Sequence, residues 1–432
     1  MRERVKTGIL LLLVGISILL TGRLLFGKPA LETASPPAYE HLAFGELRPL
    51  TEQIIPRLRL GAEDVWQVLE PWDEGQNTAW LLLLDLVRAG KPPEKTTPPN
   101  EISGKAVHAL FTVPVQAHLW LSVSLPAELR VAEVAWFSQD PLKVWFRDHQ
   151  NSWYTSQLSF LPDGWEQLLV DSFAGGVLHR LWISADWQPL VVSGEDKILI
   201  PEALPHLAPF SIQPEKLDTE KLLRSIFANP ALVRRIEERD GAVIYTDGQR
   251  GLRVFPSGQI GYTSPKSEPG LEAMELGQAL RRATQYLQFM GGWPAHLWVD
   301  PFSAPQNLPG SRRQGHTEII SLISVQRGMR LLAAEPAVRL RFSDRGVIDY
   351  QRQVVLLDSP LGAERALIDP RQAVQAVDNY LKGNSGVGSL LKVYPAYYVG
   401  HGTAQPAWVF QFKHGQTVFV QGHTGQILAS HE

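Results

Sequence analysis

The best candidates for metal ligands in the sequence are three histidines near its C-terminal end: His401, His414 and His423. Imidazole nitrogens are common zinc ligands, and three of them can hold a catalytic zinc ion with one open position. Each of these histidines lies in or beside a predicted turn between antiparallel strands, where polar residues are favoured without any ligand. We therefore expect ordinary surface turns rather than a metal centre.

A second group of candidates is acidic. Glu237, Glu238 and Asp240 could hold a cation or act as an acid and base pair. They follow Arg234 and Arg235 at the predicted end of a helix, and such a mixed-charge segment is usually a solvated surface. The sequence therefore favours a charged helix end at this position.

Wider catalytic patterns are missing from the sequence. It contains no P-loop, dinucleotide glycine fingerprint, zinc-protease His-Glu-x-x-His motif or Gly-x-Ser-x-Gly elbow. The 432 residues include no cysteine, which excludes disulfides and thiol catalysis. The formal net charge of −3 argues against a general affinity for nucleic acid. We predict no catalytic residue, no metal ligand and no cofactor, and a protein that is not an enzyme.

Tryptophan is concentrated in one region. Ten of the 13 tryptophans fall between Trp66 and Trp187. Trp120 and Trp145 lie on the polar face of two predicted strands, where exposed rings could stack on sugars or anchor a protein partner. Packing between a sheet and a helix is the interpretation that the sequence favours. The two rings are our candidate partner surface outside the membrane.

The elements that would position these residues begin with a hydrophobic run at residues 7–26. About 20 apolar residues are enough to cross a bilayer as a helix. Basic residues precede the run, so residues 1–6 are predicted to be cytoplasmic and the bulk of the chain extracytoplasmic. A cleaved signal peptide is the competing interpretation, but its best cleavage position, after Ala34, places Glu32 where a small residue is preferred.

The predicted membrane helix carries regularly spaced small residues. Gly8, Gly15 and Gly22 recur every seven residues, and Ser17 and Thr21 lie on a neighbouring stripe. Small residues let two helices approach closely in lipid, and hydroxyl groups can add hydrogen bonds. We expect these five residues to contact a partner helix.

The rest of the chain is expected to be an α+β protein of several domains in which helices pack on antiparallel sheets. Pro29, Pro36 and Pro37 make residues 27–40 a linker. The length suggests two or three domains after it. We place an N-terminal, tryptophan-rich domain at 41–212, a central helix-plus-strands domain at 213–266 and a C-terminal α+β domain at 267–432.

Local patterns predict individual elements. Helices are expected at 47–55 and 61–69, and the alternation in 117–125 predicts a strand. Asp218 and Asp369 are expected to cap helices, and Asn229-Pro230 is expected to start another. The order of a helix followed by antiparallel strands occurs at 218–262, 271–357 and 369–430, which suggests a structural repeat.

One segment resembles a known family. The run from Ile226 to Gly241, Ile-Phe-Ala-Asn-Pro-Ala-Leu-Val-Arg-Arg-Ile-Glu-Glu-Arg-Asp-Gly, continues through the Tyr-Thr-Asp-Gly of 245–248 to the Tyr-Thr-Ser-Pro of 262–265. These residues resemble the YycH (WalH) family, extracytoplasmic regulators of the WalK sensor histidine kinase. Weaker likenesses are the single anchor, 37–40, 50–56, 394–397 and 406–409.

The resemblance implies a regulator without catalytic residues in the cell membrane of a Gram-positive bacterium. It implies two protein partners, a WalK-like sensor histidine kinase and a YycI-like membrane protein, in addition to the lipid bilayer. It also implies a three-part outer region whose later domains share a topology with the companion. The alternative function is a cell-wall polymer binding protein or enzyme that uses the tryptophan-rich face.

Overall fold

The computed structural model describes residues 43–99, 104–121, 129–192, 197–227, 229–264, 274–299, 317–383, 388–413 and 415–431. The predicted anchor at 7–26 and the linker at 27–40 lie outside the described residues. None of the helices formed by the described residues is long and apolar enough to cross a membrane. Ala43–Glu432 forms one compact unit, which is the subject of the following description.

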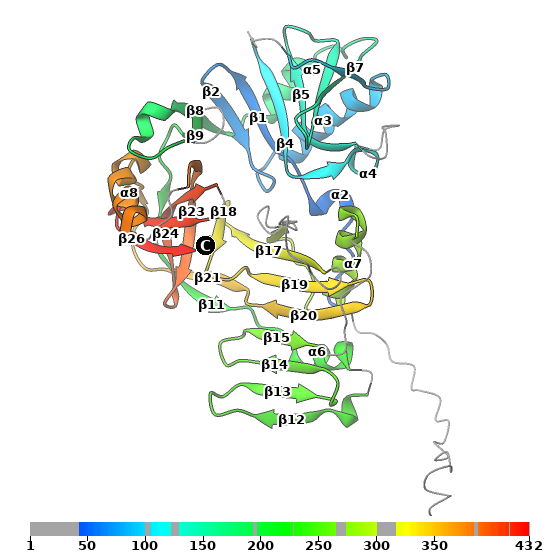
Figure 1. The fold of residues 1–432 in the computed structure, drawn as a ribbon, viewed down its shortest axis with the longest axis vertical. Coiled ribbons are helices and arrows are strands. Elements are labelled where there is room, and N and C mark those ends of the chain that lie inside the picture. The colour runs from blue at the N-terminus through cyan, green and yellow to red at the C-terminus, as the bar shows by residue number, and fades with distance from the viewer. Residues whose placement is uncertain are drawn as a thin grey trace, which may run out of the picture. The chain divides into compact units, whose positions relative to one another are not determined.

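Two large sheets organise the described residues (Figure 1). The first has nine strands in the order β3-β7-β6-β5-β4-β1-β2-β8-β9, with neighbouring strands antiparallel. Its strands are β1 (Arg57–Ala62), β2 (Val65–Leu69), β3 (Glu94–Thr96), β4 (Ala106–Gln116), β5 (Arg130–Phe137), β6 (Lys143–Asp148), β7 (Trp153–Gln157), β8 (Val177–Ile183) and β9 (Lys197–Pro201).

Helices cover one face of this first sheet. Leu83 of α3 (Gln76–Ala89) and Leu169 of α5 (Trp165–Ser172) share a core with Val107 and Trp136 of the strands. Because side chains alternate between the two faces of a strand, His108 and Ala135 point to the opposite face. The first sheet therefore has one face in the helical core and another face available for a site.

The second sheet has 15 strands, and its main path runs β12-β13-β14-β15-β20-β19-β17-β18-β23-β24-β11-β21. The strands are β11 (Phe210–Pro214), β12 (Arg234–Glu237), β13 (Val243–Thr246), β14 (Gly251–Val254), β15 (Ile260–Thr263), β16 (Leu297–Val299), β17 (Glu318–Gln326), β18 (Met329–Leu332), β19 (Val338–Ser343), β20 (Gly346–Arg352), β21 (Val355–Pro360), β23 (Leu390–Gly400), β24 (Thr403–Phe412), β25 (Thr417–Gln421) and β26 (Ile427–His431). A small separate sheet pairs β10 (His206–Leu207) with β22 (Arg365–Ala366).

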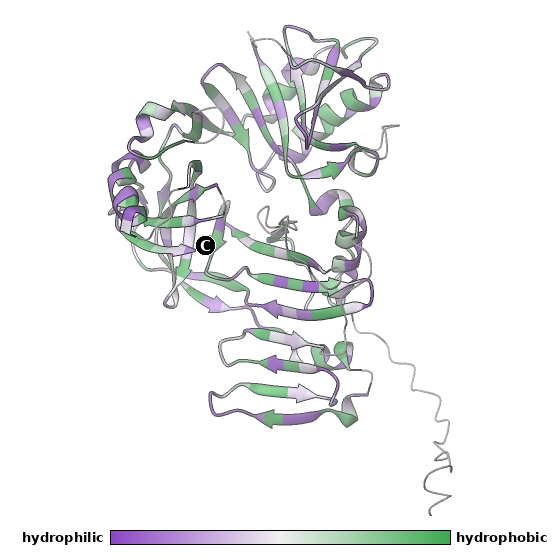
Figure 2. Cartoon of the chain, viewed as in Figure 1, coloured by the Kyte–Doolittle hydropathy of each residue, from purple (hydrophilic) through white to green (hydrophobic). Residues whose placement is uncertain are grey.

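Along many strands hydrophobic and hydrophilic residues alternate, as expected of sheets with two different faces (Figure 2). Leu280 and Leu287 of α7 (Leu276–Phe289) pack in one core with Leu340 of β19. Val377 of α8 (Val374–Gly383) packs with Trp408 of β24 in a second core. The α+β class and the predicted packing of helices on antiparallel sheets are confirmed.

Several predicted elements are present. Asp218 caps α6 (Thr219–Ile226) by accepting a hydrogen bond from the Lys221 amide at 3.0 Å. Asp369 caps the 3-10 turn η3 (Pro370–Ala373), which leads into α8. The order of a helix followed by antiparallel strands occurs three times, beginning with α6, α7 and α8. That part of the sequence prediction is confirmed.

Three predicted helices differ from the structure. Residues 61–69 are not a helix but the end of β1, a turn and β2. Helix α2 covers only Leu50–Gln53, a single turn within the predicted 47–55. Asn229-Pro230 opens only the 3-10 turn η2 (Pro230–Leu232), and the chain then extends as β12. The pairing of β12 with β13 sets its conformation, and a helical spacing of apolar residues does not reveal that pairing.

Strands from different predicted domains pair with each other. β15, from the predicted central domain at 213–266, pairs with β20, from the C-terminal domain at 267–432. β11, which begins in the predicted N-terminal domain at 41–212, pairs with β21 and β24 of the second sheet. The two later segments therefore contribute strands to a single sheet.

Candidate functional site

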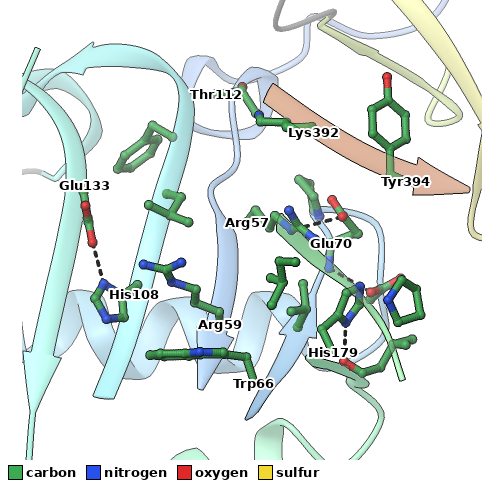
Figure 3. Close-up of a pocket in the computed structure, with 18 of the residues that line it drawn as sticks. Arg57, Arg59, Trp66, Glu70, His108, Thr112, Glu133, His179, Lys392 and Tyr394 are labelled. Carbon is green, nitrogen blue, oxygen red and sulfur yellow. Dashed lines mark hydrogen bonds and ion pairs between the residues drawn. The ribbon is translucent and has the colours of Figure 1, made fainter. Parts of the chain in front are cut away.

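A cavity of about 1460 Å³ lies between the second face of the first sheet and strands β18 and β23 of the second sheet (Figure 3). It is larger than most small-molecule pockets, which span roughly 300–1,000 Å³. We call it the cleft. Its charged lining includes Arg57, Arg59, Glu63, Glu70, Asp73, Glu133, Arg147, Arg330 and Lys392, and its aromatic lining includes Trp66, Trp72, Trp298 and Tyr394.

Register brings the first charged cluster together. Glu133 on β5 is directly opposite Arg147 on β6, and the Arg147 Nε donates to a Glu133 carboxylate oxygen at 2.8 Å. His108 on β4 contacts the other oxygen of the same carboxylate. Burial would raise the pKa of Glu133, but the hydrogen bond from His108 and the charges of His108 and Arg147 lower it to about 2. Glu133 therefore remains ionised inside the sheet.

The second charged cluster joins the two sheets. The Glu70 carboxylate lies 3.1 Å from Arg57 Nε of β1 and 3.3 Å from Arg330 Nη2 of β18. Burial would raise the pKa of Glu70, but these two guanidinium groups lower it below its ordinary value. Nearby, the Trp72 indole donates to the Gly328 carbonyl at 3.0 Å. One carboxylate is thus shared by arginines from both walls of the cleft.

Positive charge dominates around this second cluster. Burial, together with the charges of Arg57 and Arg330, lowers the pKa of Lys392 to about 8, and the charge of Glu70 opposes this shift. Burial, together with the charge of Arg57, also lowers the pKa of His179 to about 4. Figure 3 shows Lys392 on β23 facing the strand that carries Arg57. The arrangement favours anionic groups at this end of the cleft.

Aromatic rings flank Arg330. The Arg330 guanidinium carbon lies 5.2 Å from the Trp72 ring centre and 4.7 Å from that of Tyr394. Trp72 in turn contacts Trp298 edge to face, with ring centres 5.8 Å apart. Cation–π contacts of this kind hold a guanidinium in place while leaving some of its N–H groups available. The cleft can therefore orient an anion beside an aromatic wall.

The structure does not place Trp120 and Trp145 on an exposed surface. Trp120 belongs to the helical turn α4 (Ala117–Trp120), is 3% exposed and donates to the Ile54 carbonyl at 3.2 Å. Trp145 on β6 is 9% exposed and packs edge to face against Phe137 and Trp153. Both rings pack in the interior, which is the interpretation that the sequence favours, and the candidate partner surface at Trp120 and Trp145 is not exposed. The reason is that β4 ends at Gln116 and that the aromatic cluster covers the second ring.

The other residues considered for chemistry have ordinary settings. His401 lies in the turn between β23 and β24, and His423 in the turn between β25 and β26, while His414 is outside the described residues. Within the described ranges, no group of three or more His, Asp or Glu side chains is placed to hold a metal ion. The two described histidines therefore lie in turns, as the sequence predicts.

The acidic candidates form ion pairs at a hairpin rather than at a helix end. Glu237 pairs with Arg235 of the same strand at 2.5 Å. Glu238 and Asp240 both pair with Arg253 of β14, at 2.6 and 2.8 Å. The segment is a charged surface, as expected, but the predicted helix at this position is wrong.

The five predicted membrane contacts, Gly8, Gly15, Ser17, Thr21 and Gly22, lie outside the described residues and stay a prediction. Sequence reasoning missed the residues that converge in the cleft. Glu70 and Arg330 are 260 positions apart, so no local motif joins them. The one local signal is the period-2 burial of Trp66 and Val68, which would have identified β2 and its neighbouring Glu70.

Comparison with known proteins gives a fold-level answer. No protein family model matches the chain, and no curated protein matches it. The crystal structure of YycH from Bacillus subtilis is similar, with a TM-score of 0.63 and 11% sequence identity over 89% of this chain and 98% of that one. An uncharacterised protein from Eubacterium rectale covers 54% of this chain and 90% of its own, with 13% identity and a TM-score of 0.36. The chain therefore has the fold of YycH.

Proposed function

We propose that this protein is a membrane-anchored, non-catalytic regulator of a two-component sensor histidine kinase that controls cell-wall metabolism. The observation that carries the proposal is the likeness to YycH over almost the whole length of both chains. A likeness confined to one domain would leave the arrangement of the remaining residues unaccounted for. The Asn229-Pro230 segment, where the sequence resemblance is sharpest, supports the same assignment.

The proposed mechanism is binding rather than chemistry. Residues 7–26 act as a single membrane helix, residues 1–6 lie in the cytoplasm and the remaining chain lies outside. The helix and the outer domains contact a WalK-like kinase together with a YycI-like companion. A regulator shifts a kinase between two signalling states only if it binds the two states with different affinity. The glycine stripe at 8, 15 and 22 is the proposed contact within the membrane.

The alternative function is a cell-wall polymer binder or enzyme with a tryptophan-rich face. Its two candidate rings, Trp120 and Trp145, are buried. Its direct test is a polysaccharide pull-down with the Trp145→Ala variant. Polymer binding that depends on Trp145 would favour this alternative over the regulator. We therefore retain the regulator as the proposed function.

Bulky residues on the glycine stripe test the proposed mechanism. Gly15→Leu combined with Gly22→Leu is expected to reduce association with the kinase and change the output of a kinase-dependent reporter, because leucine side chains keep two helix backbones apart. The matched control is Ile9→Phe combined with Ile16→Phe, which places bulk away from both the glycine stripe and the Ser17 and Thr21 hydroxyl groups. If the glycine variant behaves like the wild type, the stripe is not the contact.

A further inference from the structure

The outer edge of the second sheet is a short, exposed strand. Strand β12 stands at the end of the strand order and pairs with β13 on its inner side (Figure 1). Among the described residues, no strand pairs with its outer side. All four of its residues are exposed, and Ile236 exposes 48% of its surface. The unpaired backbone groups of such an edge can pair with another strand, and a short, charged edge restricts that pairing to a strand of complementary charge.

The hydrogen-bond pattern fixes which residues can pair outward. The Glu238 amide donates inward to the Ala242 carbonyl at 2.8 Å, at the end of the β12–β13 ladder. Backbone groups alternate in direction along an antiparallel strand. Ile236 therefore also directs its N–H and C=O toward β13, whereas Arg235 and Glu237 direct theirs outward. A new strand would exchange hydrogen bonds with these two residues.

The residues of this edge are self-complementary in charge. The segment 234–238 reads Arg-Arg-Ile-Glu-Glu, with two cations on one side of an isoleucine and two anions on the other. If the same segment from a second molecule runs antiparallel with Ile236 opposite Ile236, Arg235 faces Glu237 and Arg234 faces Glu238. Opposite charges directly across a ladder stabilise it, and like charges destabilise it.

We propose that the edge strand β12 pairs antiparallel with β12 of a second copy of this chain, in the register centred on Ile236. This register satisfies the alternation of the backbone, because Arg235 and Glu237 of the two copies form the hydrogen-bonded pairs. Ile236 then occupies a non-hydrogen-bonded position, where side chains approach most closely. The proposal stands on the edge strand alone and does not depend on the proposed kinase regulation.

Neighbouring registers would place like charges opposite each other. Moving the pairing by one residue in each copy places either Arg235 opposite Arg235 or Glu237 opposite Glu237. Each of these juxtaposes like charges at the centre of the ladder. The pair between Arg235 and Glu237 lies within one strand, and its side chains are 54% and 65% exposed, so both can exchange partners in the proposed register. Glu238 pairs with Arg253 in the single chain, so the register rests on Arg235 and Glu237. The charge pattern therefore selects a single register and a second copy as the occupant.

Disulfide trapping tests the register directly. The chain has no cysteine, so an Ile236→Cys variant of the full-length protein carries a single thiol. Opposed residues at a non-hydrogen-bonded position have Cα atoms about 4.5 Å apart, within the range of a disulfide. Mild oxidation in membranes is expected to give a covalent dimer. An Ile244→Cys control on the same face of β13 is expected to stay monomeric, because three strand spacings place its two copies ~14 Å apart.

Charge exchange provides the second measurement. In the Ile236→Cys background, Arg235→Glu alone or Glu237→Arg alone is expected to reduce the trapped dimer roughly tenfold, because each change creates two like-charge pairs. A mixture of the two single variants restores both opposite-charge pairs and is expected to give a heterodimer. The Arg235→Glu and Glu237→Arg double variant is expected to form a homodimer again.

Because β12 is exposed, we expect these substitutions to leave the fold intact. A thermal melt of each variant checks that the variants are equally stable. The proposed register is overturned if both single charge variants give as much trapped dimer as Ile236→Cys alone. It is also overturned if the mixture of the two variants gives no trapped heterodimer. Trapping of Ile236→Cys to a different membrane protein overturns the choice of a second copy. Absence of any trapped dimer in folded protein overturns the pairing altogether.

Discussion

Replacing Arg352 with methionine is expected to lower the free energy of unfolding by about 3–5 kcal/mol, the usual cost of breaking a buried ion pair. Arg352 ends β20 and is 1% exposed. Its Nε and Nη2 donate to the two oxygens of Glu215 at 2.8 and 3.0 Å, and its Nη1 donates to the Gly292 carbonyl at 2.9 Å. The substitution leaves a largely buried carboxylate without its counter-charge.

Urea denaturation of the variant and the wild type measures this loss. An Arg352→Met and Glu215→Leu double variant is expected to recover part of it, because the uncompensated carboxylate is removed as well. The exposed Arg339→Met is a control for loss of a surface arginine, with an expected change within about 0.5 kcal/mol. A loss below about 1 kcal/mol for Arg352→Met would show that the paired hydrogen bonds between Arg352 and Glu215 contribute little to the free energy of unfolding.

The second large effect is acid sensitivity. The pKa of His179 is lowered from 6.5 to about 4, so the unfolded chain binds a proton in this range that the folded protein does not. The stability from His179 is therefore complete above pH 6.5 and is lost as the pH falls toward 4. The pKa of Glu133 is lowered from 4.5 to about 2, so its contribution is lost between pH 4.5 and 2. Each shift corresponds to about 3 kcal/mol.

Denaturant titrations at several pH values test this expectation. The free energy of unfolding is expected to decline from pH 6.5 to 4, and a His179→Gln variant is expected to show a flatter decline over the same interval. His118→Gln, on an exposed residue of α4, serves as the matched control. An identical slope for the wild type and His179→Gln would mean that buried His179 does not resist protonation.

Local signals predicted the elements that are defined by neighbouring residues. Asp369 followed by Pro370 marks a helix start because the cap and the fixed backbone of proline act within one turn. Asp218 likewise predicts the start of α6, where its side chain accepts a hydrogen bond from the Lys221 amide. These features need no information from the rest of the chain.

Elements that depend on distant partners were predicted less well. Residues 61–69 contain helix-compatible spacing, yet they form strands because β1 pairs with both β2 and β4. The alternation in 117–125 predicts a strand, but the described part turns into α4, where the Trp120 indole reaches the Ile54 carbonyl. Tertiary contacts override weak local preference in both cases.

The cleft shows the same limit for function. The converging residues come from four places in the chain: Arg57 from β1, Glu70 from the position after β2, Arg330 from β18 and Lys392 from β23. Sequence spacing gives no sign that they converge. The pairing of strands within the sheets and contacts between them such as Glu70–Arg330 bring these charges together. A site of this kind is visible once the topology is known.

The most direct test of the proposed regulator is co-purification of the full-length protein with the resident sensor histidine kinase from solubilised membranes. We expect the tagged wild-type protein to retain the kinase, and the Ile9→Phe and Ile16→Phe control to retain it equally. Recovery of folded, membrane-inserted protein without the kinase, in membranes that contain the kinase, would contradict the proposed function.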